Sequence, residues 1–467
     1  MSVEKILDFR IEKDILGDIE VPSDVYWGIN TQRAIKNFNI SGKTFPEIFI
    51  ISLAQLKKAC LLANLDINLI EHDIGEAILK ALNEILEENR HLDQFPIDIF
   101  QTGSGTQTNM NMNEVLANRA NQILGHPMGQ KKPVHPNDHV NKGQSSNDVI
   151  PSTMHISSLY IIKKNLFPSL DRLIESLSKK IEEFKDIVKV GRTHLQDAVP
   201  IPLSLEFEVY KKQIETNKER LKRICEELHY IPIGGTAVGT GLGTHEKFSE
   251  LAVNHLSKIT NIPFKVNPIM AEGISSHNII VNASSGIRLL ALSLLKMAND
   301  IRWMGSGPRT GLSELILPQN EPGSSIMPGK VNPTQSEALI QVCLQIIGND
   351  SVISFAEAYG SILDLNVCKP IMIVNLLNSI QILSNAINSF MENCLLDIEA
   401  NQDHIKSQLE RLLMIVTNLT PILGYDKCSA IAMKAYDENK SIKEVIDEMG
   451  LKFEEDLDKL LDPKRMV

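Results

Sequence analysis

Apolar side chains recur every three or four residues along most of this 467-residue chain, a spacing that predicts helices. The spacing is already clear in residues 53–63 and 78–86. In residues 169–184 the apolar positions form one stripe and the charged positions lie elsewhere, so we expect a helix with one solvated face. Residues 279–304 and 371–395 are apolar on nearly every side, which is typical of helices enclosed by neighbours, including neighbours from other subunits. The pattern predicts a mainly α fold with long buried helices.

Changes in this pattern divide the chain into three predicted domains. Residues 1–142 mix short segments with helical stretches and form an N-terminal domain. Residues 143–397 carry the long apolar and amphipathic stretches, separated by short glycine-rich turns, and form a central helical domain. Residues 398–467 return to short charged helices, which predicts a small C-terminal domain.

Local residues mark several predicted helix ends. Pro168 and Pro370 lack a backbone N–H, so each is expected to start or kink its helix. Ser441 and Glu444 have the spacing of a capping box, in which each side chain accepts a hydrogen bond from the backbone of the other residue. The most apolar run, residues 287–304, is interrupted by four charged residues, which argues against a membrane span.

Composition and charge narrow the choice of partner. Hydrophobic residues make up 43% of the chain and charged residues 22%, as in an ordinary folded protein. The formal net charge of −11 repels nucleic acid and anionic lipid over most of the surface, so a small molecule or another protein is the expected partner. A site for an anion must therefore be local.

Cysteine spacing and the N-terminal residues bear on location. The six cysteines include no C-x-x-C pair, so neither a zinc ribbon nor an iron–sulfur cradle is indicated, and reduced buried thiols are expected. The stretch MSVEKILDFRIEKD at the start has no apolar signal core, and its acidic residues argue against a transit peptide. We therefore expect cytoplasmic residence.

Four polar islands rich in glycine, serine or asparagine interrupt the apolar pattern. They read QTGSGTQTNMNMNE from Gln101, HPNDHVNKGQSSND from His135, GRTHLQDA from Gly191 and EPGSSIMPGKVNPTQSE from Glu321. Any one of them alone is most simply a connecting loop. In the fourth island the prolines remove backbone donors and clash with a preceding helical turn, so we predict a loop up to Pro333 and a helix after it.

The first two islands are rich in neutral hydrogen-bond donors. Ser104, Thr106 and the amides of the flanking glycines form one candidate cradle for an oxyanion. Ser145, Ser146 and Asn147 form a second. Neutral donors can bind a carboxylate without many cations, which suits an acidic protein.

The other two islands add titratable groups. His194 lies between donors in the third island and titrates near neutral pH, although a lone histidine is more often a packing or surface residue. In the fourth island Ser324 and Ser325 supply hydroxyls and amides. Lys330 and Asn332, in the same island, can clamp a carboxylate.

These donors, with one lysine, one histidine and no metal or cofactor motif, favour one kind of reaction. Removing a proton from the carbon next to a carboxylate builds a second negative charge on that carboxylate, which amides and an ammonium group can stabilise. A general base takes the carbon-bound proton, and a general acid protonates the group that leaves the adjacent carbon. The product is an alkene, and no cofactor is expected.

Five motifs resemble those of the fumarase/aspartase superfamily. GSSIMPGKVNP at residues 323–333 resembles its signature, and GTQTNMNMNEVLANRA, HPNDHVNKGQSSND, GRTHLQDA and GGTAVGTGLGTH each resemble class II fumarases. The match runs from VYWGINTQRA near the start to GYDKCSAIAMKAY near the end, so it covers almost the whole chain. Several long motifs in the right order are far more specific than one short motif.

The resemblance implies a fold and a reaction. It implies a mainly helical three-domain subunit whose central five-helix bundle packs into a homotetramer, with each active site built from three subunits. The implied reaction is the reversible hydration of fumarate to L-malate, a step of the tricarboxylic acid cycle, without a metal or other cofactor. The implied partner is a small dicarboxylate, with no nucleic acid and no membrane.

The resemblance also implies roles for individual residues. Ser324 would take the carbon-bound proton, and His194, oriented by Glu337, would handle the proton of water or hydroxyl, although the reverse assignment stays open. A serine hydroxyl is a poor base unless amides and cations lower its pKa. Lys330 and Asn332 would hold a substrate carboxylate. The further substrate contacts would be Ser104, Gly105, Thr106, Ser145, Ser146, Asn147, Thr193, Ser325 and Val331.

The HPND motif resembles a second carboxylate site outside the catalytic pocket. That site would comprise Lys132, His135, Pro136, Asn137 and Asp138. Class II fumarases often carry arginine a few residues before this motif, and lysine keeps the charge but loses the bidentate geometry. A turn in which Asn and Asp cap a helix explains the motif about as well.

Two other functions fit parts of the sequence. An aspartate ammonia-lyase of the same superfamily abstracts the same proton with an amine as the leaving group, but the signature here reads MPGKVNPTQ, as in fumarases, rather than MPAKVNPVVPE. A non-catalytic protein, such as a superfamily member recruited as a lens crystallin, could lose its site residues. Ser324, Lys330, Asn332, His194 and Glu337 are all present. Hydration of fumarate is therefore the predicted activity.

Overall fold

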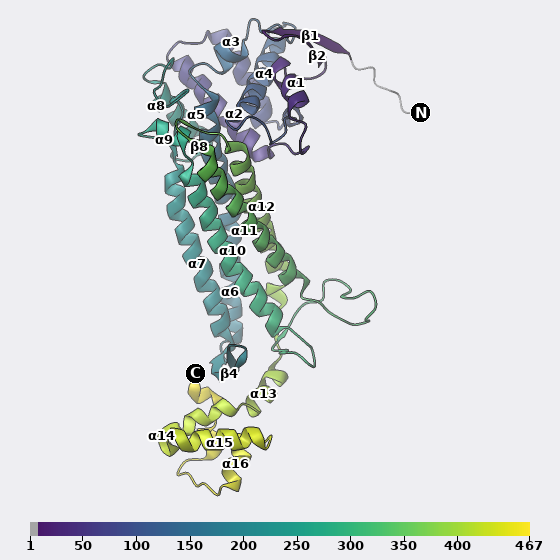
Figure 1. Ribbon diagram of the computed structural model, residues 1–467, viewed down its shortest axis with the longest axis vertical. Coiled ribbons are helices and arrows are strands. Elements are labelled where there is room, and N and C mark those ends of the chain that lie inside the picture. The colour runs from purple at the N-terminus through teal and green to yellow at the C-terminus, as the bar shows by residue number, and fades with distance from the viewer. Residues whose placement is uncertain (1–7) are drawn as a thin grey trace. The chain divides into compact units, whose positions relative to one another are not determined.

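The computed structural model describes residues 8–467, and most of them are helical (Figure 1). Residues 1–7, which include half of the stretch that argued against a signal peptide, lie outside the described residues. The chain forms two compact units. Unit 1 comprises the described residues up to 166 together with 219–288 and 345–382, and unit 2 comprises 167–218, 289–344 and 383–467. The boundaries of the three predicted domains stay a prediction.

Unit 1 is organised around α2 (Glu47–Asp66), which packs against α3 (His72–Leu86), α5 (Ser146–Ile161) and α8 (Phe248–Thr260). Twelve of the α2 residues are buried, so this helix forms the centre of an apolar core. The other elements of unit 1 are β1 (Phe9–Asp14), β2 (Gly17–Pro22), α1 (Ile29–Asn37), α4 (Thr106–Ile123), β5 (Tyr230–Ile231), β6 (Lys265–Val266), α9 (Met270–Ser275), β8 (Ser361–Ile362) and β9 (Leu365–Asn366), with short turns at Leu92–Gln94, Pro136–Val140 and Ile162–Leu166.

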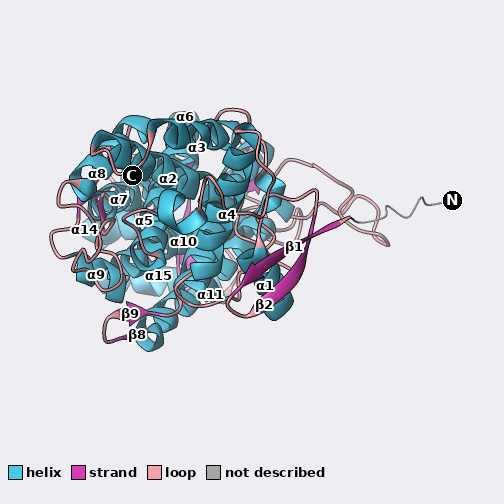
Figure 2. Cartoon of the chain, turned by 90° about the horizontal axis from the view of Figure 1, so that it is seen from above, coloured by secondary structure: helices cyan, strands magenta, loops and turns pink. Residues whose placement is uncertain are grey.

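Unit 2 has a small core near the C-terminus, where α15 (Tyr425–Asp437) and α16 (Ile442–Glu448) bury Ile431 and Val445 completely. The other elements of unit 2 are α6 (Phe167–Phe184), β3 (Val188–Thr193), β4 (Gln196–Pro202), β7 (Leu315–Ile316), β10 (Glu399–Ala400), α13 (Gln402–Glu410), α14 (Thr420–Leu423) and α17 (Leu457–Leu460), with 3-10 turns at Leu395–Asp397, Leu413–Leu419 and Pro463–Met466. The sheets of residues 8–467 have two strands each, and their strands are short (Figure 2).

The described chain contains five long helical runs. Four are single helices, α7 (Leu203–Leu228), α10 (Asn278–Met304), α11 (Thr334–Gly360) and α12 (Lys369–Asn393), and each contributes residues to both units. The fifth run is α5 followed by α6, joined through the π-helical turn at Ile162–Leu166. Pro168 is the second residue of α6, and its missing N–H breaks the regular ladder of hydrogen bonds there.

The helices predicted from apolar spacing are confirmed. The stretches 53–63, 78–86 and 169–184 lie in α2, α3 and α6. The apolar stretches from 279 and 371 form α10 and α12, and Pro370 is the second residue of α12. The capping box of Ser441 and Glu444 is present, and a helix begins directly after Pro333, as predicted.

Parts of the first three islands differ from the prediction of loops. Most of the first island is helix, because α4 begins at Thr106, and α5 begins inside the second island at Ser146. The third island forms the two strands β3 and β4. Asparagine and glycine obscured the starts of α4 and α5, because both residues are poor helix formers and are common in turns.

The long helices are less enclosed within one chain than their apolar sequences predict. Exposed apolar side chains on α10 and α11 include Leu292, Trp303 and Phe355. By length and hydropathy alone four helices of the described chain could cross a membrane, at Glu47–Asp66, Asn278–Met304, Thr334–Gly360 and Lys369–Asp397. The prediction against a span in α10 rests on its charged residues, of which Arg288 pairs with Asp350 at 2.7 Å.

Candidate active site

The first island places hydroxyl groups at the N-terminus of α4. Gly105 precedes the helix with a φ of 74°, in the left-handed region that glycine adopts without strain. Ser104 Oγ and Thr106 Oγ1 lie 2.6 Å apart and share a hydrogen bond. Ser104 is buried and Thr106 is half-buried. The sequence therefore folds these hydroxyls against the free amides of a helix start, where negative charge is favoured.

A distant segment holds this loop in place. A Cβ atom at Gly103 would lie 1.4 Å from the carbonyl oxygen of Val367, so only glycine permits the close approach. The backbone N–H of Lys369 donates to the carbonyl of Gly103 at 3.1 Å. The start of α12 thus fixes the loop that carries Ser104.

The second island places a further set of donors at the N-terminus of α5. Ser145 caps this helix: the N–H of Asn147 donates to Ser145 Oγ at 3.2 Å, and the N–H of Ser145 donates to Asp148 Oδ1 at 2.9 Å. Asn147 Nδ2 donates to the carbonyl of Ala237 at 2.9 Å. Burial raises the pKa of Asp148, and backbone N–H donors, including two from residues 234–236 at 3.0 and 2.8 Å, counter that rise.

The two helix starts lie beside each other. Asn109, in the second turn of α4, donates a hydrogen bond from Nδ2 to Ser146 Oγ at 3.0 Å. Each helix start carries partial positive charge; the start of α4 has no side-chain cap, whereas at α5 the N–H of Asn147 donates to Ser145 Oγ. Together, the two helix starts with their serine and threonine hydroxyls and the side-chain amide of Asn147 are suited to bind carboxylates.

The HPND motif forms a short turn of π-helix, Pro136–Val140. His135 Nδ1 accepts hydrogen bonds from the N–H groups of Asn137 and Asp138 at 3.1 and 3.2 Å. Lys132, Asn137 and Asp138 are exposed. The motif therefore caps its own turn, although through histidine rather than through Asn and Asp, and carboxylate binding there stays a prediction.

The third island presents Thr193 and His194 at the tip of the β3–β4 hairpin. His194 and Leu195 are the two turn residues, and both have left-handed φ angles, 58° and 59°. Two residues with positive φ give a turn of type I′, which glycine and asparagine normally occupy. Leucine in this region is strained. Thr193, His194 and Leu195 are all exposed.

A buried ion-pair network anchors this hairpin. Glu314 is completely buried and pairs with both Arg192 and Lys189, the latter at 3.0 Å. Arg192 Nη2 also donates to Gln408 Oε1 at 3.2 Å. Because Arg192 directly precedes Thr193, the network fixes the base of the exposed turn.

The signature island is a loop before α11, as predicted, and it closes on itself. A Cβ atom at Gly323 would lie 1.8 Å from the carbonyl oxygen of Lys330, so the two arms of the loop meet at a glycine. Asn332 Nδ2 donates to the carbonyl of Gly323. Ser324 Oγ accepts hydrogen bonds from the N–H groups of Ile326 and Met327 at 3.3 and 3.0 Å. Amides pointing at this oxygen would stabilise its deprotonated form.

Other predicted residues of this loop face solvent. Lys330 Nζ donates to Asn332 Oδ1, so these two side chains are held together. Ser325, Val331 and Lys330 are exposed. Glu337 lies in the first turn of α11, a position that suits an acidic residue.

The structure does not join His194 to Glu337 within one chain. Both are exposed, and among residues 8–467 no hydrogen bond or ion pair links them. The predicted residues thus fall into two sets. Those around Ser104 and Ser145 belong to unit 1, and Thr193, His194 and the signature loop belong to unit 2.

Sequence reasoning missed several supporting residues. Asn109, Asp148 and Glu314 hold predicted site segments, and Lys57 lies behind one of them. Two signals were available: Ser145 and Asp148 have capping-box spacing, and Lys57 interrupts an apolar helical stripe. Glu314 carries no local signal, because its partners are more than a hundred residues away.

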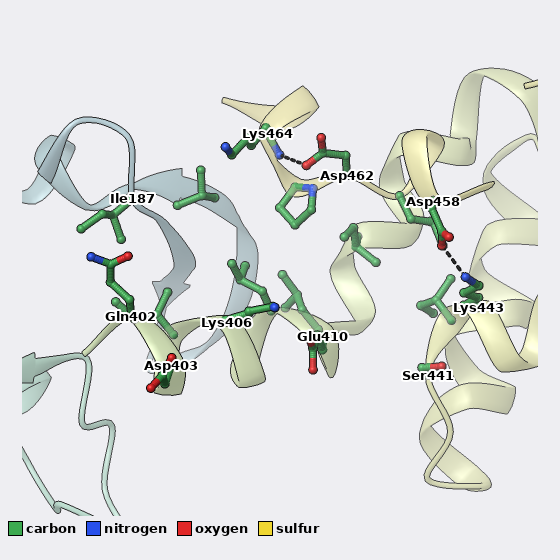
Figure 3. A pocket seen from close by; sticks show the side chains of 18 of the residues that line it. Ile187, Gln402, Asp403, Lys406, Glu410, Ser441, Lys443, Asp458, Asp462 and Lys464 are labelled. Carbon is green, nitrogen blue, oxygen red and sulfur yellow. Dashed lines mark hydrogen bonds and ion pairs between the residues drawn. The ribbon is translucent and has the colours of Figure 1, made fainter. Parts of the chain in front are cut away.

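Two cavities lie away from the predicted residues. One, of about 900 Å³, is in unit 2 and is lined by segments that include Ile187, Lys406 and Asp462 (Figure 3). The other, of about 680 Å³, is in unit 1 beside the glycine-rich loop 234–245. Neither is lined by a site residue predicted from the sequence. Within residues 8–467 no group of three or more His, Cys, Asp or Glu side chains could hold a metal ion.

Comparison with known proteins identifies the family. Residues 17–348 match the family described as "Lyase", and residues 415–467 match "Fumarase C C-terminus". "Fumarate hydratase, mitochondrial" of Rhizopus oryzae is 47% identical over 461 residues, which cover 98% of this chain and 93% of that protein. "Fumarate hydratase class II" of Nitrosomonas europaea is 46% identical over 459 residues, 98% and 99% of the two chains. This chain belongs to the class II fumarases.

The fold supports the same family. The crystal structure of a class II fumarase from Schistosoma mansoni matches with a TM-score of 0.95 at 38% identity, over 98% of this chain and 99% of that chain. The mainly helical fumarase fold expected from the motifs is therefore confirmed. Fumarases are lyases, so the structure and the comparisons agree on the class of reaction.

Proposed function

We propose that this protein catalyses the reversible hydration of fumarate to L-malate. The observation that carries the proposal is the pair of adjoining helix starts, α4 and α5, whose hydroxyls and amides are linked through Asn109 and Ser146. Such ends favour negative charge, and a dicarboxylate carries two negative groups. Membership of the class II fumarases supports fumarate and malate as the dicarboxylates, and thereby a place in the tricarboxylic acid cycle.

In the direction from malate, the reaction removes a proton from the carbon next to a carboxylate. The electrons move into that carboxylate, which then carries a second negative charge, and Lys330, Asn332 and the amides of the signature loop stabilise it. The hydroxyl on the adjacent carbon leaves as water after it accepts a proton, which gives fumarate. Hydration is the same path in reverse.

Ser324 is our proposed base for the carbon-bound proton. Two N–H groups donate to its oxygen, the arrangement that a serine alkoxide needs. His194, oriented by Glu337, is proposed to exchange the proton of water or hydroxyl. The remaining proposed substrate contacts are Ser104, Gly105, Thr106, Ser145, Ser146, Asn147, Thr193, Ser325 and Val331. A second, weaker carboxylate site at Lys132 and residues 135–138 is proposed from the motif alone.

We propose a homotetramer with active sites shared between subunits. Two observations support it: His194 and Glu337 are not joined within one chain, and apolar side chains such as Leu292 and Phe355 are exposed on long helices. In a tetramer these side chains would pack against other copies rather than against lipid. Cytoplasmic residence is also proposed, since all six cysteines are free. Cell fractionation tests the location.

One assay distinguishes hydration of fumarate from the aspartate ammonia-lyase reaction. Purified protein is given L-malate or L-aspartate in the presence of a chelator, and the ultraviolet absorbance of fumarate is followed. Fumarate from malate alone supports a hydratase. Fumarate from aspartate alone would assign the protein as an ammonia-lyase, and absence of product from both would reject an active lyase. Loss of malate turnover in the chelator would reject a reaction without metal.

A further inference from the structure

A lysine is buried behind the first turn of α5. Lys57 belongs to α2 and is only 1% exposed. Its Nζ donates to Asn141 Oδ1 and to Gln144 Oε1, both at 2.9 Å. Burying an ammonium group costs free energy unless it is paired and hydrogen-bonded, so a lysine at this position suggests a specific role. Burial lowers the pKa of Lys57, and the nearby charge of Asp148 opposes that effect.

The two acceptors of Lys57 belong to the turn that leads into α5. Gln144 directly precedes Ser145, the residue that caps this helix. Asn141 Nδ2 donates to the carbonyl of Gln144 at 3.1 Å, which closes the turn. The position of the Lys57 ammonium group therefore sets the position of the helix cap.

Asn141 also connects Lys57 to α4. Asn141 Oδ1 accepts a hydrogen bond from Asn109 Nδ2 at 3.2 Å, and the same amide group donates to Ser146 Oγ at 3.0 Å. One chain of contacts thus runs from Lys57 through Asn141 and Asn109 to Ser146. Lys57 and Asn109 are buried and Asn141 and Ser146 are half-buried, so hydrogen bonds among these side chains restrain their positions.

Asp148 holds the same helix turn from another side. It is completely buried, accepts the N–H of Ser145, and accepts two N–H groups from the loop 234–236. Thr236 in that loop has a left-handed φ of 57°, a strained conformation for a β-branched residue. Two buried side chains, Lys57 from α2 and Asp148 from α5 itself, therefore fix the donors of Ser145, Ser146 and Asn147.

We propose that Lys57 is a positioning residue for dicarboxylate binding. It acts through Asn141 and Gln144 and does not touch the substrate, and it holds the starts of α4 and α5 at the spacing that two anionic oxygens require. This inference rests on the proposed function, because it assigns Lys57 to the same dicarboxylate site.

The test compares Lys57→Met with Lys58→Met. Methionine matches the lysine side chain as far as Cε and removes the donors and the charge. Residues that orient the ligands of a metal contribute about 10- to 100-fold to its affinity, and we expect the lower end of this range for a positioning residue at a dicarboxylate site. We therefore expect the inhibition constant of succinate, a dicarboxylate that cannot react, and the KM for malate to rise about tenfold in Lys57→Met, with kcat within about threefold. Lys58 lies next in α2 but bonds to Asn83 and Glu87, so Lys58→Met is expected to leave both constants unchanged.

A structural role alone would give a different result. If Lys57→Met lowers the melting temperature but leaves the succinate inhibition constant and KM within twofold of the unmodified protein, the inference is wrong. Should that variant not fold, Gln144→Met removes one acceptor and must raise the succinate constant about threefold; an unchanged constant rejects the inference. Failure of the proposed function shows separately, as absence of malate turnover in the unmodified protein.

Discussion

Individual residues were predictable where several donor-rich segments interrupt a mainly apolar chain. Ser104, Ser145 and Ser324 stood out because hydroxyls cluster with glycine in otherwise apolar surroundings, and the structure places each beside backbone amides or other hydroxyls. The left-handed φ of His194 was not predictable, because histidine rarely adopts it and the turn follows from the pairing of β3 with β4. The partners of Lys57 were not predictable either, since they lie about 85 residues further along the chain.

Replacing Ser324 by alanine tests the proposed base directly. The hydroxyl that two amides hold is lost, while the loop contact between Asn332 and Gly323 remains. We expect malate turnover to fall at least about a hundredfold, the scale of general base catalysis, with the proposed oligomer unchanged in sedimentation. Ser407→Ala, at an exposed serine of α13 that bonds only locally, serves as the control. Unchanged turnover in Ser324→Ala would assign the base to another residue.

Among the elements, the long helices were predicted well and the short strands were not. Apolar spacing identifies α2, α3, α6, α10 and α12, because a helix buries one face at a period of 3.6 residues. The start of α4 was hidden by an Asn-rich sequence whose buried side chains bond to neighbouring segments instead of packing as apolar groups. Hairpins β1–β2 and β3–β4 depend on pairing between segments, which composition alone does not reveal.

The β3–β4 hairpin is predicted to depend on Glu314. Glu314→Gln removes the carboxylate that pairs with Arg192 and leaves Lys189 with Glu206 alone, at 3.1 Å, and breaking a buried ion pair costs about 3–5 kcal/mol in the free energy of unfolding. Urea denaturation measures this loss, and malate turnover should fall with it because His194 lies at the tip. Glu455→Gln removes the partner of Arg465 at the surface, where we expect no measurable change. Equal stability of the two variants would contradict the anchoring role.

The contact between α3 and α4 is predicted to weaken in acid. Arg119 binds both oxygens of Glu84, at 2.6 and 2.7 Å, and holds the pKa of that carboxyl at about 2, with a further contribution from His91. A lowered pKa means that Glu84 stabilises the fold above its ordinary pKa of 4.5 and loses this contribution as the pH falls from about 4.5 to about 2. Glu84→Gln should therefore melt lower than the unmodified protein at pH 7, and the difference should vanish near pH 2.

A melting-temperature difference that persists unchanged below pH 3 would contradict this account of Glu84. Lys179 pairs with Glu175 on an exposed stretch of α6. Glu175→Gln is therefore the control, because it removes a glutamate carboxylate from an ion pair that is exposed to solvent. Its melting temperature should follow that of the unmodified protein at every pH.

At the scale of the whole molecule, the motifs predicted the family and the helical architecture, and both are confirmed. The arrangement of the active site could not follow from one chain. His194 and Glu337 are exposed and unpaired with each other among residues 8–467, so any site that uses both needs a further contact. Sequence patterns report which residues are apolar or polar, but not which copy of a chain supplies them.

Mixing two inactive variants tests the shared site. His194→Asn and Glu337→Gln are each expected to lose turnover as pure oligomers. If the proposed oligomer builds each active site with these two residues from different subunits, randomly mixed oligomers regain about one quarter of the malate turnover, because that share of sites receives both intact residues. No recovery after unfolding and refolding the mixture together would place both residues in the same subunit. Each variant refolded alone is the control.

The glycine at position 103 has a consequence for synthesis of the protein. Its loop is closed by the backbone around Val367 and Lys369, about 260 residues later in the chain. A ribosome adds about 5–20 residues each second. Roughly 15 to 50 seconds therefore pass between the synthesis of Gly103 and that of the segment that contacts it. The first anion cradle cannot be completed while the chain is still short, and a nascent polypeptide therefore gains its binding chemistry only near the end of translation.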